Sequence, residues 1–189
     1  TPKPSSAASD VYKRQGSGST VVSRTGAQGF QVSSGIGVDR AQLANVYELR
    51  MELEGGAAAL AALRRNAADL AAMAEALAAL EAHLEHPEQG VEHDVAFHVA
   101  IAAATHNSTY QDLLQYLNLQ LRLAVSTARS NSRLQAGLTA AVHQEHVAVF
   151  EAIRAGNPEQ ARQAAVFHLQ QAARRLQLDP LFSAATQTP

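Results

Sequence analysis

Apolar residues recur every three or four positions across most of residues 38–176, which is the spacing of one face of an α-helix. Polar, glycine-containing or proline-containing junctions interrupt this pattern and divide it into six segments. The segments predict helices at residues 38–64, 66–86, 91–105, 108–129, 133–155 and 158–176. The pattern therefore predicts an all-α domain.

Residues that favour helix ends stand at several of the junctions. Asn66 is suited to cap the second helix, and Ser108 with Gln111 would form a capping box for the fourth. The pair Asn131-Ser132 is expected to separate the fourth helix from the fifth. Gly156-Asn157-Pro158 supplies a C-cap, an N-cap and a first helical residue in that order.

The first 37 residues lack the helical pattern. The run PSSAASDVYKRQ resembles translated adaptor sequence, so we interpret residues 1–20 as non-native or disordered. In residues 21–37, two short β-prone runs flank a loop that contains Gly26 and Gly29, which predicts a β-hairpin followed by a linker. An isolated hairpin is marginally stable in water, so it is expected to belong to a larger unit. The helical domain is then residues 38–180, and residues 181–189 are a tail.

Composition agrees with a helical domain and excludes several classes of protein. Of the 189 residues, 47% are hydrophobic, and most of these are the helix formers alanine and leucine. The chain has no cysteine and therefore no disulfide framework or cysteine-based zinc site. No apolar run is long enough to span a membrane, and the net charge of −2 comes without a basic stripe. We expect a soluble cytoplasmic protein.

A carboxylate and an imidazole stand together in the third predicted helix. Asp94 and His98 are four residues apart and share a face with Phe97 and Ile101. Polar groups on a core-facing stripe are costly to bury unless a partner satisfies them, and a bound metal ion is one such partner.

Two further histidines lie on apolar faces of other predicted helices. His146 is at the centre of the stripe of the fifth helix, and His168 is surrounded by alanines on the sixth. Together with Asp94 and His98 they would hold a Zn, Ni, Mn or Fe ion and leave a position for water or a ligand oxygen. His143, on the flank of the fifth helix, competes for a ligand role.

Simpler interpretations remain open for the same residues. An inward histidine is often a hydrogen-bonded core residue, and Asp94 with His98 could be a local pair. Arg50 and Glu54 lie within the apolar stripe of the first helix, where they form either an ion pair or, for Arg50, an anion-binding group that faces a pocket. A structural bundle with buried polar pairs would need no metal at all.

The motifs of the chain also resemble a known family, the C-terminal effector-binding (FCD) domain of FadR-type GntR transcription regulators. The resemblance covers residues 38–176 and rests on Tyr47-Glu48-Leu49-Arg50 with Glu54, Asp94-x-x-Phe97-His98-x-x-Ile101, Glu145-His146-x-x-x-Phe150-x-Ala152-Ile153, Gly156-Asn157-x-x-x-Ala161 and His168-Leu169. It implies an antiparallel bundle of six to seven helices.

The resemblance also implies a ligand site. The metal ligands would be Asp94, His98, His146 and His168, and the carboxylate of a small organic or sugar acid would complete the shell. Arg50 becomes the candidate partner of that carboxylate. Asn107 falls where the family often has an asparagine after its metal-bearing helix, so it is a second candidate for effector binding.

In that family the DNA-binding part is an N-terminal winged helix-turn-helix, and residues 21–32 resemble its wing hairpin. The recognition helix is absent, so this chain is not expected to bind an operator, and the intact protein is expected to be a homodimer. The alternative is a metal-dependent hydrolase or lyase on a helical bundle, which would need a general base beside the metal. No spare glutamate for that role is evident on the same helix faces.

Overall fold

The computed structural model describes residues 40–86, 89–133 and 137–178. The hairpin, the linker, the adaptor-like run and the tail lie outside the described residues. The described part of the chain consists of helices and contains no strand: α1 (Arg40–Arg64), α2 (Ala67–Ala82), α3 (Val91–Ala103), α4 (Ser108–Gln120), α5 (Arg122–Arg133), α6 (Leu138–Ala155) and α7 (Pro158–Arg175). The predicted all-α fold is confirmed.

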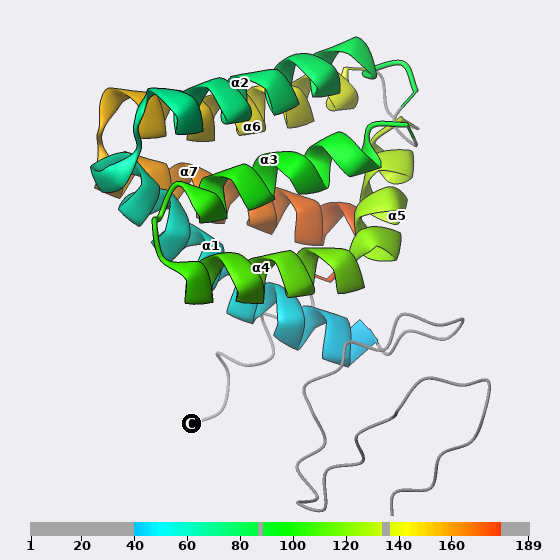
Figure 1. Cartoon of the computed structure of the whole chain (residues 1–189). Coiled ribbons are helices and arrows are strands. Elements are labelled where there is room, and N and C mark those ends of the chain that lie inside the picture. Colours follow the sequence, from blue (N-terminus) through cyan, green and yellow to red (C-terminus); the bar gives the residue numbers. More distant parts are fainter. Residues whose placement is uncertain (1–39, 87–88, 134–136, 179–189) are drawn as a thin grey trace, which may run out of the picture. The chain divides into compact units, whose positions relative to one another are not determined.

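The helices of the bundle form two layers (Figure 1). In one layer α3 packs between α2 and α4, and in the other α7 packs between α1 and α6. Helix α5 crosses one end of the bundle and contacts α3, α6 and α7. The space between the layers is where side chains from α1, α3, α6 and α7 can meet.

Small residues on α1 allow this helix to approach its neighbours closely. Its four alanines at positions 57, 58, 61 and 62 are fully buried. A Cβ atom at Gly55 would lie only 2.9 Å from Cγ2 of Val166 on α7. Larger side chains, among them Met73, Phe97 and Ile153, fill the core around this contact.

The predicted division of residues 108–133 into helices is wrong. We expected one helix over residues 108–129, but α4 ends at Gln120 and α5 starts at Arg122. Leu121 leaves the helical conformation, with φ −95° and ψ 4°. Helix α5 then continues through Asn131-Ser132, where we expected a break, and the Ser132 hydroxyl donates to the carbonyl of Ala128 within the helix. The described residues therefore form seven helices where periodicity predicted six.

Most of the expected helix ends are confirmed, with two corrections. Asn66 caps α2, and its side chain and that of Asp69 form a capping box. Asn157 caps α7 directly after Gly156, which is left-handed at the end of α6. The cap of α4 is Asn107 instead of Ser108, because the Asn107 side chain accepts from the N–H of Thr109. Helix α2 ends at Ala82, four residues before the expected boundary.

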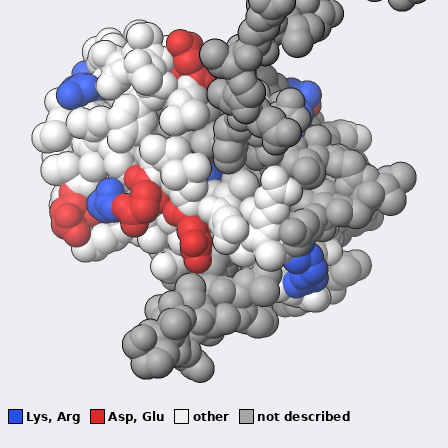
Figure 2. All heavy atoms as spheres, turned by 90° about the horizontal axis from the view of Figure 1, so that it is seen from below, with Lys and Arg blue, Asp and Glu red and all other residues white. Residues whose placement is uncertain are grey.

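The outside of the bundle carries no continuous basic patch on the face seen in Figure 2, as far as the described residues show. Acidic and basic side chains lie there as small groups. None of the described helices is both long and apolar enough to cross a membrane.

A candidate metal centre between three helices

Three buried histidines from three helices meet inside the bundle. His98 on α3, His146 on α6 and His168 on α7 each offer a ligand nitrogen, and these nitrogens all lie within 4.8 Å of one another. The exposed fractions of the three residues are 7%, 1% and 5%. Nitrogens of three imidazoles at this separation could bind one divalent ion.

Glu54 on α1 orients the first of these histidines. Its Oε2 lies 2.6 Å from Nδ1 of His98, and its Oε1 accepts a hydrogen bond of 2.6 Å from Nε of Arg50. Arg50 also donates to Oδ1 of Asn118 at 3.3 Å. Burial alone would raise the pKa of Glu54, but Arg50 and His98 together lower it to about 2. Glu54 is therefore a carboxylate, and it accepts the proton on Nδ1 of His98.

Glu145 on α6 has the same role for His168. Its Oε2 lies 2.9 Å from Nδ1 of His168, and Arg175 donates to both Glu145 oxygens at 3.0 Å and 3.1 Å. Burial, followed by the electrostatic effect of His146 and His98, lowers the pKa of His168 well below its usual value. The neutral ring is favoured, with its proton on Nδ1 and its lone pair on Nε2.

The backbone orients the third histidine. Nδ1 of His146 lies 3.0 Å from the carbonyl oxygen of Val142, one turn earlier in α6. The opposite nitrogen, Nε2, is buried and has no hydrogen-bond partner. All three rings thus use Nδ1 for an outer acceptor, which leaves Nε2 as the nitrogen available to an ion, as is usual for metal-binding histidines.

Asp94 lies at the edge of the three histidines. Its Oδ1 is 3.4 Å from Nε2 of His146, without hydrogen-bond geometry, and its Oδ2 is 3.9 Å from Nε2 of His98. Arg129 on α5 donates to the same Oδ1 at 3.2 Å. Burial would raise the pKa of Asp94, but His146, His98 and Arg129 together hold it far below its usual value. The structure therefore places a buried carboxylate beside the three nitrogens.

A small cavity of about 20 Å³ opens next to these groups. Its lining includes Asp94, His98 and His168 together with Tyr47, Arg50 and Arg129. A volume of this size holds one or two water molecules. Arg50 therefore fits both sequence interpretations at once: it forms the ion pair with Glu54, and it also faces a cavity.

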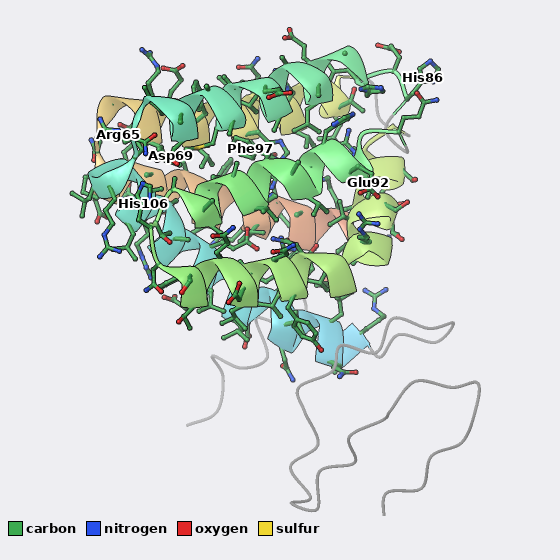
Figure 3. The ribbon with its side chains drawn as sticks, viewed as in Figure 1. Arg65, Asp69, His86, Glu92, Phe97 and His106 are labelled. Atoms are coloured by element: carbon green, nitrogen blue, oxygen red, sulfur yellow. The ribbon has the colours of Figure 1, made fainter. Side chains whose placement is uncertain are left out.

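The remaining candidates lie elsewhere. Asn107 caps α4 and is not among the residues that line this cavity. His143 is buried one turn before His146 and is not one of the three converging histidines. Figure 3 shows His106 at one end of the bundle with Asp69, to which its Nε2 lies 2.9 Å away, while Glu92 lies at the other end.

Sequence analysis missed the roles of Glu145, Arg175 and Arg129. The i,i+7 spacing of His168 and Arg175 was a usable signal, because it places them on one face of α7. Glu145 gave no such signal, because its neighbour His146 lies at the centre of the apolar stripe. Both oxygens of Glu54 and of Glu145 are engaged by arginine or histidine. Neither carboxylate is therefore free to act as the general base that a hydrolase would need.

Comparisons with known proteins agree with this architecture. The family model of the FCD domain matches residues 45–171. A search of curated proteins gave no significant match. Among solved structures, the chain is similar to Streptococcus agalactiae GntR, with 24% sequence identity and a TM-score of 0.58 over 69% of this chain and 57% of that chain.

A second solved structure, E. coli McbR/YncC, is similar with 21% identity and a TM-score of 0.61 over 78% of this chain and 71% of that chain. Similarity at these identities shows the shared fold. The chain spans less than two thirds of the length of the Streptococcus protein.

Proposed function

We propose, since the chain belongs to the FCD domain family, that its bundle senses a small carboxylate through a bound divalent metal and regulates DNA-binding heads of the GntR type. The observation that supports this proposal is that three buried histidines each offer a ring nitrogen within 4.8 Å of the others, while Nδ1 of each ring has an acceptor outside the cluster. Without an ion, Nε2 of His146 is left buried and without a hydrogen-bond partner beside the Asp94 carboxylate.

The metal would be held by His98, His146 and His168, with Asp94 as the fourth ligand. This donor set of imidazoles and one carboxylate fits zinc, and it also fits nickel, manganese or iron. A divalent ion would neutralise the buried carboxylate and provide a position for an effector oxygen. Glu54 and Glu145 would fix the orientation of the His98 and His168 rings toward the ion.

Arg50 supports the choice of a carboxylate as effector. Its guanidinium lines the cavity beside Asp94 and His98, and it is almost fully buried. A planar, permanently charged group in a small cavity suits bidentate binding of a carboxylate. A small organic or sugar acid would meet both the metal and Arg50. For Asn107 the structure supplies a capping role, so its part in effector binding stays a prediction.

Regulation would be a shift between two populations of a homodimer. An effector that binds one arrangement more tightly would favour it and so reposition paired DNA-binding heads. Two heads related by a two-fold axis would bind a palindromic site. The bundle would act as the sensing and dimerisation part and would carry no enzymatic activity.

The test is thermal melting of the purified chain with and without EDTA, together with the metal content of the same sample. We expect about one first-row divalent ion per chain and a melting temperature that falls on chelation, because the ion binds the folded state alone. His146→Ala should abolish both the metal and the effect of EDTA. Small carboxylates should then raise the melting temperature of the metal-loaded protein.

His106→Ala is the matched control, since His106 lies away from the centre and pairs with Asp69. It should leave metal content unchanged. A wild-type protein that holds no metal after incubation with zinc, and that melts identically with EDTA, would refute the metal-centred sensor.

A further inference from the structure

A second cavity lies behind His146, between α2, α5 and α6. Its volume is about 20 Å³, like that of the first cavity. Leu80, Leu84 and His143 line this cavity alone, and it shares Arg129, Ser132 and Val142 with the first cavity. The two spaces are therefore neighbours that are separated by common wall residues.

One of the residues that line the second cavity, His143, has a ring nitrogen without a hydrogen-bond partner. The residue is only 9% exposed, and its Nδ1 is buried without a hydrogen bond. A buried unsatisfied nitrogen costs about 1–3 kcal/mol, so native proteins seldom keep one without a role. A ligand atom in the cavity would satisfy it.

Arg129 stands in the wall between the two cavities. Its Nη1 donates to Asp94, and its guanidinium passes over Gly90 at the start of α3. A Cβ atom at Gly90 would lie 2.1 Å from Nη2 of Arg129. The Arg129 guanidinium can therefore lie there only because residue 90 is a glycine.

Charge indicates which ligand these features suit. Around the first cavity, Arg50 pairs with Glu54, Arg175 with Glu145 and Arg129 with Asp94, so the three cations and three carboxylates balance. A divalent metal would add two positive charges to this buried site. One carboxylate would neutralise half of them, whereas two would neutralise both, and uncompensated buried charge is costly.

We propose that the effector is a short dicarboxylate, with one carboxylate at the metal and Arg50 and the other between Arg129 and His143. This inference rests on the proposed function and extends it to the class of ligand. Each cavity is about the size of one carboxylate group, and the two cavities share the wall residues Arg129, Ser132 and Val142. Arg129 thereby determines specificity for diacids over monoacids.

The experiment compares acids of equal chain length on the zinc-loaded full chain by calorimetric titration. Succinate is paired with butyrate, and glutarate with valerate, because these diacids are weak chelators that will not strip the metal. We expect the better diacid to bind about tenfold or more tightly than its matched monoacid, as the second carboxylate gains a charge-assisted partner. Metal content is measured after each titration.

Three variants test whether the preference for diacids arises at the second cavity. Arg129→Met should bring the affinities for succinate and butyrate to within about twofold of each other. The two acids are compared within the same zinc-loaded variant, because Arg129 also donates to Asp94 and its loss can weaken both. Gly90→Ala should give the same result, because it displaces the Arg129 guanidinium without removing its charge. His143→Leu should weaken diacids alone. Arg122→Met is the control, since Arg122 lies on the same helix but is exposed and pairs with Glu92.

The outcomes separate this inference from the proposed function. If monoacids bind the metal-loaded protein as tightly as their matched diacids, the sensor stands and the dicarboxylate assignment is wrong. The assignment is also wrong if the diacid preference survives in Arg129→Met. If neither kind of acid binds the zinc-loaded protein, the dicarboxylate assignment is wrong, and metal content with the response to EDTA decides the metal-centred sensor separately.

Discussion

At the scale of single residues, the candidate site depends on groups that never touch the ligand. Glu145 contacts His168 through one oxygen and holds Arg175 through both. Glu145→Gln keeps the shape of the side chain but removes the charge that accepts the Nδ1 proton. We expect zinc affinity to fall by about 10–100-fold, because outer partners of metal-binding histidines have effects of this size. Competition with a chromophoric chelator measures this change.

The control for Glu145→Gln is Glu151→Gln on the same helix. Glu151 is exposed and pairs with Arg154 alone among the described contacts. Its loss should leave zinc affinity unchanged within about twofold, since exposed ion pairs contribute about 1 kcal/mol or less. Equal losses in the two variants would contradict the role given to Glu145.

Residue patterns could predict the histidines but not their partners. Inward-facing positions on amphipathic helices identify His98, His146 and His168, because periodicity fixes which face of a helix is buried. Glu145 and Arg129 reach the site only through the packing of one helix against another, which depends on axial offsets that a single helix does not encode. The contact between Glu54 and His98 also depends on how α1 packs against α3, so it could not be predicted from either helix alone.

At the scale of whole helices, the approach of α1 to α7 can be tested at Gly55. A helix interior normally gains about 0.8–1 kcal/mol from Gly→Ala. Here the new Cβ would lie 2.9 Å from Cγ2 of Val166, and such overpacking costs about 1–3 kcal/mol. We expect Gly55→Ala to be neutral or destabilising in the natural chain.

In a Val166→Ala background, the effect of Gly55→Ala on the free energy of unfolding should change sign. Removal of Cγ2 relieves the contact, so Gly55→Ala should then stabilise the protein by up to about 1 kcal/mol. Urea unfolding of the four proteins in this cycle measures the coupling. Additive effects of the two substitutions would show that the close approach of α1 and α7 is not what requires glycine.

The division between α4 and α5 shows why element boundaries were harder to predict than element type. Leu117, Leu121 and Val125 continue the apolar spacing without a glycine or proline between them. All three are buried, yet the chain turns at Leu121 so that α5 can cross the end of the bundle. The break therefore reflects the packing of the whole bundle, which local sequence does not specify.

At the scale of the whole molecule, the metal would join α3, α6 and α7, so its binding should depend on pH in a defined direction. In the metal-free protein, His98 and His168 change the stability of the fold in opposite directions as the pH changes. The carboxylate of Glu54 overcomes burial and raises the pKa of His98, so its contribution to stability is present below about pH 6.5 and is lost as pH rises through the folded pKa. Burial lowers the pKa of His168, so its contribution is present above about pH 6.5 and is lost as pH falls.

Metal binding removes this opposition, because every ligand nitrogen must then be free of its proton. We expect the increase in melting temperature caused by zinc to be largest near about pH 7.5 and to shrink steeply toward about pH 5.5, where protons compete for Nε2. The measurement is the melting temperature with zinc minus that with EDTA at each pH, with His146→Ala as the reference. A zinc effect that stays constant over this range would mean that zinc stabilises the protein through carboxylates, because only they remain deprotonated throughout.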